Sequence, residues 1–130
     1  MSKIADYLRD AGVFYIATMD GDQPRVRPFG AVTEYKDKIY FCTNNKKKVF
    51  KQFTANQKVE ICTMAKDGTW IRVTGKVVVD DNDDARRAML EAVPSLNGLY
   101  KIGDGIFEVF HLKNMAAKVY SFTADPVVLK

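Results

Sequence analysis

Strand-like runs of branched and aromatic residues alternate along this chain with short turn signals. The clearest turns lie at residues 20–22 (Asp-Gly-Asp), 36–37 (Lys-Asp) and 67–68 (Asp-Gly). Connections this short favour antiparallel pairing, and a sheet of about seven strands must either close or bury its edges. The pattern therefore predicts a mainly β fold, an antiparallel barrel whose ends are covered by a few short helices.

Period-two patterning and turn residues define the expected strands. They cover residues 13–19, 23–35, 38–43, 59–64, 70–80, 106–113 and 117–122, and the tail 126–130 is a candidate edge segment. Three helices are expected between them from helical spacing and capping residues. Their expected boundaries are Ser2 and Gly12 for the first, Asn44 or Asn45 and Asn56 for the second, and residues 81–84 and Pro94 for the third.

Length and composition predict one domain over residues 1–130. The chain has 130 residues, of which 47% are hydrophobic, and this is enough for a single buried core. No apolar run approaches the roughly 20 residues that a membrane helix needs. The first ten residues mix charges into their apolar positions instead of forming a signal-peptide core, so we expect a cytoplasmic protein.

Side chains that could catalyse a reaction by themselves are scarce. The one histidine, His111, has no serine, cysteine or aspartate partner beside it, so we expect a structural or surface role for it. Cys42 and Cys62 lack CxxC spacing and a neighbouring histidine, which argues against a metal site and against a disulfide. No glycine-rich nucleotide motif occurs either. If the protein is an enzyme, a bound cofactor must supply the chemistry.

Two clusters of basic residues are the strongest functional signal. Alternation along a strand puts Arg25, Arg27 and Phe29 on one face. The run Lys46 to Lys48 falls at the start of the second expected helix, where free N–H groups favour an anion, and Thr43 lies just before it. Each cluster alone is simply a solvated basic surface. If residues 23–35 and 38–43 pair as a hairpin, however, the two clusters meet and form a cradle for a phosphate.

These motifs resemble those of a known family. The segments Arg-Val-Arg-Pro-Phe (25–29), Tyr-Phe-Cys-Thr-Asn (40–44) and Trp-Ile-Arg-Val-Thr-Gly-Lys (70–76) occur in an order similar to that of the pyridoxamine 5'-phosphate oxidase-like, FMN-binding split-barrel superfamily. Within it the chain is most similar to the small nitroimidazole-resistance-type flavoproteins. The resemblance implies a split barrel and a homodimer, with FMN at the interface in contact with both chains.

The resemblance also implies which residues contact the cofactor. They are Arg25, Arg27, Pro28 and Phe29 beside the flavin ring and its side chain, Cys42 and Thr43 along the ribityl and phosphate region, Lys47 and Lys48 at the phosphate, and Trp70 with Arg72 from the second subunit.

The function that the resemblance implies is an FMN-dependent oxidoreductase related to pyridoxamine 5'-phosphate oxidase, with nitroreductase-like activity as one option. It would act on a small molecule by hydride or electron transfer through the flavin. Vitamin B6 oxidases of the family carry a lysine at the position of Val32, so oxidation of pyridoxamine phosphate itself is not expected. A deazaflavin cofactor remains an alternative, as does a flavin-binding protein without turnover.

A nucleic-acid-binding barrel is the alternative from another class. It would use the same cations for backbone phosphates and Phe29, Phe41 and Trp70 for base stacking. The net charge of +4 agrees with any anionic partner, but the 16 acidic residues are interleaved with the basic ones, which argues against a continuous basic stripe.

Overall fold

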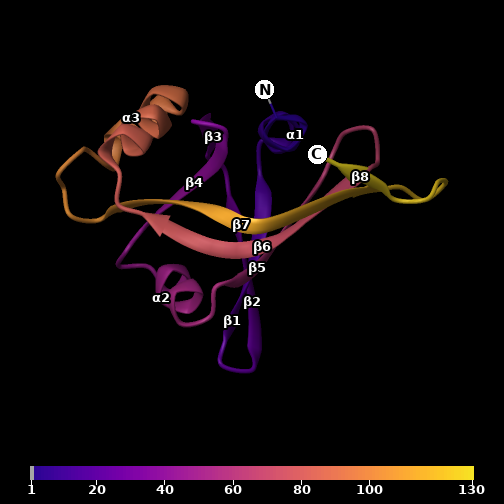
Figure 1. Cartoon of the computed structure of the whole chain (residues 1–130), viewed down its shortest axis with the longest axis horizontal. Coiled ribbons are helices and arrows are strands. Elements are labelled where there is room, and N and C mark those ends of the chain that lie inside the picture. The colour runs from indigo at the N-terminus through magenta and orange to yellow at the C-terminus, as the bar shows by residue number, and fades with distance from the viewer. Residues whose placement is uncertain (1) are drawn as a thin grey trace.

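The computed structural model, which describes residues 2–130, contains one antiparallel sheet. Its strands follow the order β2-β1-β5-β6-β7-β4-β3, and β8 pairs with β7. Figure 1 shows β6 and β7 as long curved strands, with the β1–β2 hairpin projecting away from them. The strands are β1 (Phe14–Asp20), β2 (Gln23–Phe29), β3 (Val32–Tyr35), β4 (Lys38–Asn44), β5 (Lys58–Met64), β6 (Trp70–Asp80), β7 (Phe107–Tyr120) and β8 (Val127–Leu129).

The two edge strands of the main path, β2 and β3, are consecutive in sequence. Only Gly30 and Ala31 separate the end of β2 from the start of β3, so the two edges approach within about 11 Å at this point. The sheet therefore curls round until its edges nearly meet, but no ladder joins β2 to β3. This open, curled sheet confirms the expected split barrel.

The single strand predicted over residues 23–35 is wrong. Its first half pairs with β1, where Arg27 lies opposite Ile16, and its second half pairs with β4. The hairpin at Lys36 and Asp37 is confirmed, and both residues have positive φ, as a tight turn of this kind requires. The break falls at Gly30, since glycine weakens a strand interior and permits the change of partner.

The two closing strands predicted at 106–113 and 117–122 form one strand, β7. A bulge interrupts it: Asn114 and Met115 together lie opposite Gly75 of β6, and Asn114 adopts a φ of 54°. Such a bulge leaves the strand continuous but shifts its register by one residue. The two segments expected as separate strands are therefore joined through the bulge, and both pair with β6.

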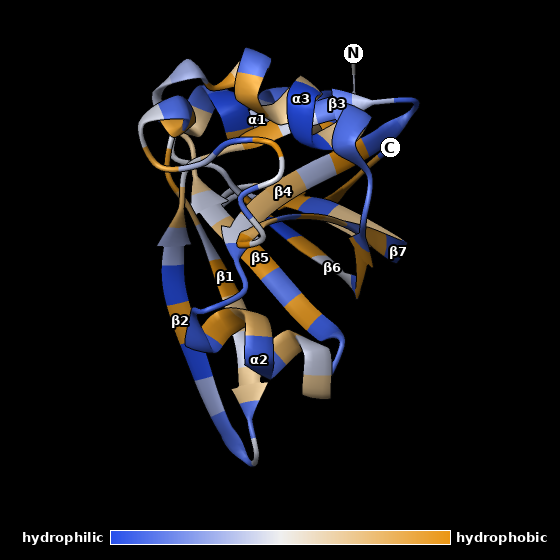
Figure 2. Cartoon of the chain, turned by 90° about the vertical axis from the view of Figure 1, so that its left-hand side faces the viewer, coloured by the Kyte–Doolittle hydropathy of each residue, from blue (hydrophilic) through white to orange (hydrophobic). Residues whose placement is uncertain are grey.

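Three α-helices and a short 3₁₀ helix cover the sheet. They are α1 (Lys3–Ala11), α2 (Lys48–Ala55), α3 (Asp83–Ala92) and η1 (Pro94–Gly98). Figures 1 and 2 show α1 and α3 at one end of the curled sheet and α2 at the opposite end, and Figure 2 shows hydropathy alternating along β5. None of these described helices has the length and apolar character of a membrane span.

The expected helix ends are mostly confirmed. Ser2 accepts hydrogen bonds from the first turn of α1, Gly12 ends that helix, and Asn56 ends α2. The cap predicted for α2 at Asn44 or Asn45 is wrong, because the helix begins only after Lys47. Asn44 is instead the last residue of β4, and it uses its side-chain oxygen and its carbonyl to accept bonds from the two residues that follow Asn45.

A cluster of phenylalanine rings fixes α2 against the sheet. Phe53 of α2 is fully buried, and its ring centroid lies 4.8 Å from that of Phe110 on β7. Phe41 of β4 packs on Phe110 at 5.6 Å and on Phe14 of β1 at 5.7 Å. The start of α2 is therefore held close to the ends of β2 and β4.

Gly75 lies opposite the bulge in β7, and there is no room for a methyl group at this position. A Cβ there would lie 2.9 Å from Leu112 Cβ and 3.2 Å from the carbonyl oxygen of Lys113. We expect Gly75→Ala to lower the free energy of unfolding by about 1–3 kcal/mol, as overpacking commonly does. Gly98→Ala is the control, because nothing lies within 4 Å of its Cβ position. Urea unfolding followed by tryptophan fluorescence measures both, and equal midpoints would contradict the predicted crowding.

Candidate functional site

A cleft of 340 Å³ opens where the chain crosses between the two sheet edges. One wall is the segment from Arg27 to Ala31, and the floor is formed by Cys42 and Thr43 of β4. The start of α2 contributes Lys47, and the segment around η1 forms the opposite wall. A volume of this size is at the lower end of the range for small-ligand sites.

A second hollow of 400 Å³ continues from the cleft past the start of α2. The two share Arg27, Lys47 and Val49, and the second also contains Arg25, Lys48 and Gln52, with one acid, Asp20. Arg27 and Lys47 therefore lie at the junction between an aromatic, largely apolar cleft and a basic hollow.

Arg27 is held at this junction by neutral groups. Its Nη1 donates to Thr18 Oγ1 at 2.8 Å and to the carbonyl oxygen of Ile16 at 3.2 Å, and its Nη2 donates to Gln52 Oε1 at 2.6 Å. Within residues 2–130 no carboxylate forms an ion pair with Arg27, and its burial and the neighbouring charge of Arg25 lower its pKa. The guanidinium is thus fixed in position while its charge remains unneutralised.

Arg25 behaves differently, although it shares the face of β2. Its Nε lies 3.2 Å from a carboxylate oxygen of Asp20, and both side chains are about half exposed. An exposed ion pair of this kind contributes little to stability, but it partly neutralises the charge. Of the two arginines, Arg27 is the better candidate for binding an anion.

The start of α2 adds further positive potential. Its N-cap residue, Lys47, makes no side-chain capping bond, so the N–H groups of the first turn are left to water or a ligand. Lys46, Lys47 and Lys48 are all exposed, and in the described part of the chain none of them pairs with an acid. The helix dipole reinforces these charges.

Thr43 provides an independent sign of a ligand. Thr43 lines the cleft, and its buried Oγ1 is the one buried side-chain oxygen or nitrogen in the described residues that has no hydrogen-bond partner. An unpaired buried hydroxyl costs about 1–3 kcal/mol, which a bound polar group would recover. The adjacent thiol is inert, because burial raises the pKa of Cys42 to about 12 and keeps it neutral, with Lys47 opposing the shift.

The aromatic side of the cleft is held in place by packing against the core. Phe29 is half-buried and lies 6.4 Å from the ring of Phe14 and 6.3 Å from that of Phe110, so its position is fixed by the core. It presents an apolar surface beside Pro28 in the same cleft. A planar aromatic ligand bearing a phosphate therefore fits the chemistry of both halves of the site.

Comparison with known families decides the identity of the fold. The family model described as pyridoxamine 5'-phosphate oxidase matches residues 1–114. The chain belongs to the pyridoxamine 5'-phosphate oxidase-like family. Among curated proteins none matches the sequence significantly.

Solved structures agree with this assignment. A NimC/NimA family protein from Clostridium acetobutylicum is 48% identical, with a TM-score of 0.94 over 98% of this chain and 89% of that one. General Stress Protein 26 from Bacillus anthracis is 15% identical, with a TM-score of 0.76 over 98% and 96%. An FAD-binding protein from Mesorhizobium loti is 16% identical, with a TM-score of 0.61 over 93% and 96%. The last two show the fold alone.

Eight of the ten positions that the sequence predicts for this oxidase-like site lie around the cleft and the second hollow. They are Arg25, Arg27, Pro28, Phe29, Cys42, Thr43, Lys47 and Lys48. The sequence predicted that a hairpin of residues 23–35 and 38–43 brings the two basic clusters together. That explanation is wrong, because β2 pairs with β1 and not with β4. The clusters meet because Arg27 reaches across to α2.

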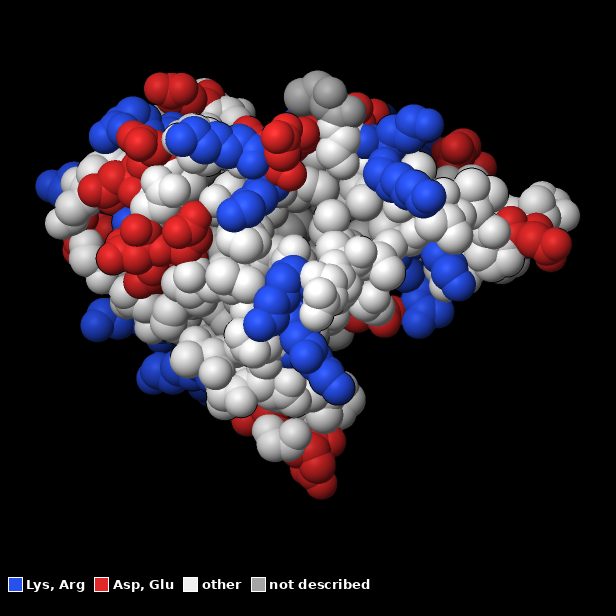
Figure 3. Space-filling model, viewed as in Figure 1, with Lys and Arg blue, Asp and Glu red and all other residues white. Residues whose placement is uncertain are grey.

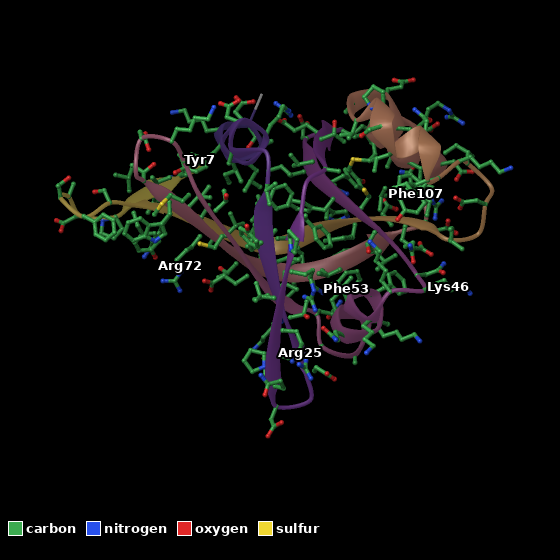
Figure 4. All side chains as sticks on the ribbon, turned by 180° about the vertical axis from the view of Figure 1, so that it is seen from behind. Tyr7, Arg25, Lys46, Phe53, Arg72 and Phe107 are labelled. Carbon is green, nitrogen blue, oxygen red and sulfur yellow. The ribbon has the colours of Figure 1, made fainter. Side chains whose placement is uncertain are left out.

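Trp70 and Arg72 lie elsewhere in the same chain. Trp70 stacks on Tyr120 at 5.8 Å and contacts Phe122 at 4.9 Å, while Arg72 pairs with Glu60 at 2.8 Å. Figure 4 shows Arg72 at the opposite end of the sheet from Lys46. Their assignment to the cofactor site is a prediction that requires a second chain.

Several groups at the site escaped the sequence-based prediction. Gln52 lies one helical turn after Lys48, a spacing that could have drawn attention to it. Thr18 lies in the middle of an apolar strand, and Leu96 and Tyr100 come from an irregular segment with no recognisable pattern. His111 packs against Tyr40 with ring centroids 5.4 Å apart and does not line the cleft.

Two threonine substitutions test whether Thr43 is reserved for a ligand. We expect Thr43→Val to leave the ligand-free protein equally stable or to stabilise it by about 1 kcal/mol, because it removes an unpaired buried hydroxyl. Thr18→Val should lower the free energy of unfolding by about 1–3 kcal/mol, since the Thr18 hydroxyl bonds both Arg27 and Gln52. Chemical unfolding of both variants measures the difference, and equal destabilisation would mean that Thr43 bonds the protein itself.

Proposed function

We propose that this protein is an FMN-binding flavoprotein that acts as an oxidoreductase. The observation that carries the proposal is the unneutralised guanidinium of Arg27, fixed by Thr18 and Gln52 at the junction of the aromatic cleft and the start of α2. A partly buried cation held by neutral partners alone carries a desolvation cost that a bound anion would offset.

The phosphate of the cofactor would lie at this junction. Arg27 would donate to it with its remaining N–H groups, Lys47 and Lys48 would add charge, and the free N–H groups of α2 would complete the contacts. The Oγ1 of Thr43 would form a hydrogen bond with a ribityl hydroxyl or with a phosphate oxygen, and this bond would satisfy the unpaired hydroxyl.

The flavin ring would occupy the cleft beside Phe29 and Pro28. This wall is apolar and anchored on the core, and Cys42 beneath it stays a neutral thiol. When bound, the flavin would supply hydride or electron transfer at N5. The chain itself would orient the ring, exclude water and place positive charge near the cofactor, which favours its reduced form.

The substrate of this proposed oxidoreductase is a small molecule. The resemblance to nitroimidazole-resistance-type flavoproteins, together with the 48% identity to a NimC/NimA family protein, supports nitro compounds as the class to test first. A deazaflavin would offer a similar ring and phosphate tail, and the absorption spectrum of the purified protein distinguishes it from FMN. A protein that holds flavin without turnover would show the spectrum but no reoxidation by any substrate tested.

A nucleic-acid-binding barrel receives less support. Figure 3 shows a short run of adjacent basic side chains down the centre of the visible face, with acidic side chains above it and at the tip below it. A colourless protein whose affinity for oligonucleotides falls steeply with salt would favour this alternative over the flavoprotein.

Substitution of the two arginines of β2 tests the phosphate contact. We expect Arg27→Met to weaken FMN binding by about 10- to 100-fold, the effect of losing a hydrogen bond to a charged group. Arg25→Met should change it by less than about threefold, because Asp20 already pairs with Arg25. Riboflavin, which lacks the phosphate, should bind wild type and Arg27→Met alike. Flavin fluorescence titration measures these affinities, and an equal loss for riboflavin would count against the phosphate assignment.

We also propose a homodimer in which Trp70 and Arg72 reach the partner's cofactor. In support, Phe122 and Met64 beside Trp70 are 84% and 57% exposed, an apolar surface that a second chain would cover.

Mixed dimers test this arrangement directly. Chains carrying Arg27→Met and chains carrying Trp70→Ala, each weak in FMN binding as homodimers, should regain one tight site per mixed dimer. That site would combine Arg27 of one chain with Trp70 of the other. Isothermal titration of purified heterodimers measures the stoichiometry. If the cofactor contacted one chain only, the mixed dimer would contain no intact site and would bind weakly.

A further inference from the structure

The side-chain amide of Gln52 has an oxygen and a nitrogen, and the oxygen already accepts all the hydrogen bonds it can from within the protein. Its Oε1 accepts a hydrogen bond from Thr18 Oγ1 at 2.6 Å and another from Arg27 Nη2 at 2.6 Å. A carbonyl-type oxygen has two lone pairs, so both are used.

The amide nitrogen of Gln52, in contrast, has no hydrogen-bond partner in the described residues. Arginine can only donate, so the oxygen of Gln52 must face Arg27, and this fixes the orientation of the amide. Across residues 2–130 its Nε2 forms no hydrogen bond, although Gln52 lines the second hollow. It also lines a third hollow of 340 Å³ that continues from there and contains Asp20, Lys48 and Lys51.

We propose that Gln52 is a phosphate-recognition residue with two roles. Its oxygen positions the Arg27 guanidinium, and its amide nitrogen donates a hydrogen bond to the same phosphate that Arg27 binds. Gln52 thereby helps the site to distinguish a phosphorylated flavin from riboflavin. This inference rests on the proposed FMN site and adds to it a residue that belongs to none of the sequence motifs.

A phosphate contact explains why position 52 has a neutral amide, although a carboxylate there would bind Arg27 more strongly. A glutamate at position 52 could accept both existing hydrogen bonds and form an ion pair with Arg27. It would, however, neutralise the cation and replace the free donor with an acceptor, and both changes disfavour a phosphate. A purely structural link between α2 and β2 would gain from glutamate, whereas a phosphate site requires glutamine.

Gln52→Glu therefore separates the two roles. We expect its melting temperature to equal or exceed that of wild type in the ligand-free state. Its affinity for FMN should fall by about 10- to 100-fold, while its affinity for riboflavin stays within about threefold of wild type. Gln52→Leu, which removes both the acceptor and the donor, is the second variant. Lys51→Ala is the control, since this neighbouring residue lines only the third hollow and should leave the ratio of the two affinities within about threefold.

The readout is the ratio of riboflavin to FMN dissociation constants, measured by fluorescence titration for wild type and each variant. A collapse of this ratio in Gln52→Glu and Gln52→Leu supports the inference, and an unchanged ratio in both overturns it. If wild type itself binds the two flavins equally, or binds neither, the proposed phosphate site fails and the role of Gln52 fails with it.

Discussion

The path of the chain between the two edges of the sheet is the constraint on which the rest of the structure depends. Gly30 and Ala31 carry the backbone from β2, which pairs with β1, to β3, which pairs with β4. Two residues can span only a short gap, so the sheet has to curl until its edges approach. The same segment leaves a cleft there, because no ladder closes the space between β2 and β3.

The helix α2 gives this opening the basic side chains of the candidate site. Phe53 fixes the helix to the core through Phe110, and the start of the helix then lies beside the end of β2. Gln52 adjoins Phe53 in sequence and reaches Arg27 from the same helix. The packing of Phe53 on one face of α2 thus fixes the position of Gln52 on another face, and with it the position of the Arg27 guanidinium.

Much of the fold could be predicted from local sequence, whereas most of the candidate site was predicted from the resemblance to a known family. Turn residues, caps such as Ser2 and the alternation of the strands carry their signals within a few residues. The break at Gly30 could not be predicted in this way, because strand-like residues continue on both sides of it and only the order of strands in the sheet assigns them different partners.

The remaining errors have similar causes. The bulge at Asn114 falls between the two strands expected at 106–113 and 117–122, yet the ladder with β6 resumes immediately after it, and only that long-range pairing shows that the strand continues. Thr18 and Gln52 are 34 residues apart and meet only through the packing of α2 on β1. The motif residues of the site were recognisable by resemblance, whereas the residues that support them were not.

The unneutralised charge of Arg27 links ligand binding to folding. The guanidinium and its neutral partners join β1, β2 and α2, so these three elements share the cost of holding an unneutralised, partly buried cation. An anion bound at this point would remove that cost, and a ligand that binds only the folded state stabilises it by mass action. The unpaired hydroxyl of Thr43 adds a second cost of the same kind in the adjoining cleft. Both costs lie along one continuous surface, which is why a single ligand with a phosphate at one end and a hydrogen-bonding chain next to it accounts for them together.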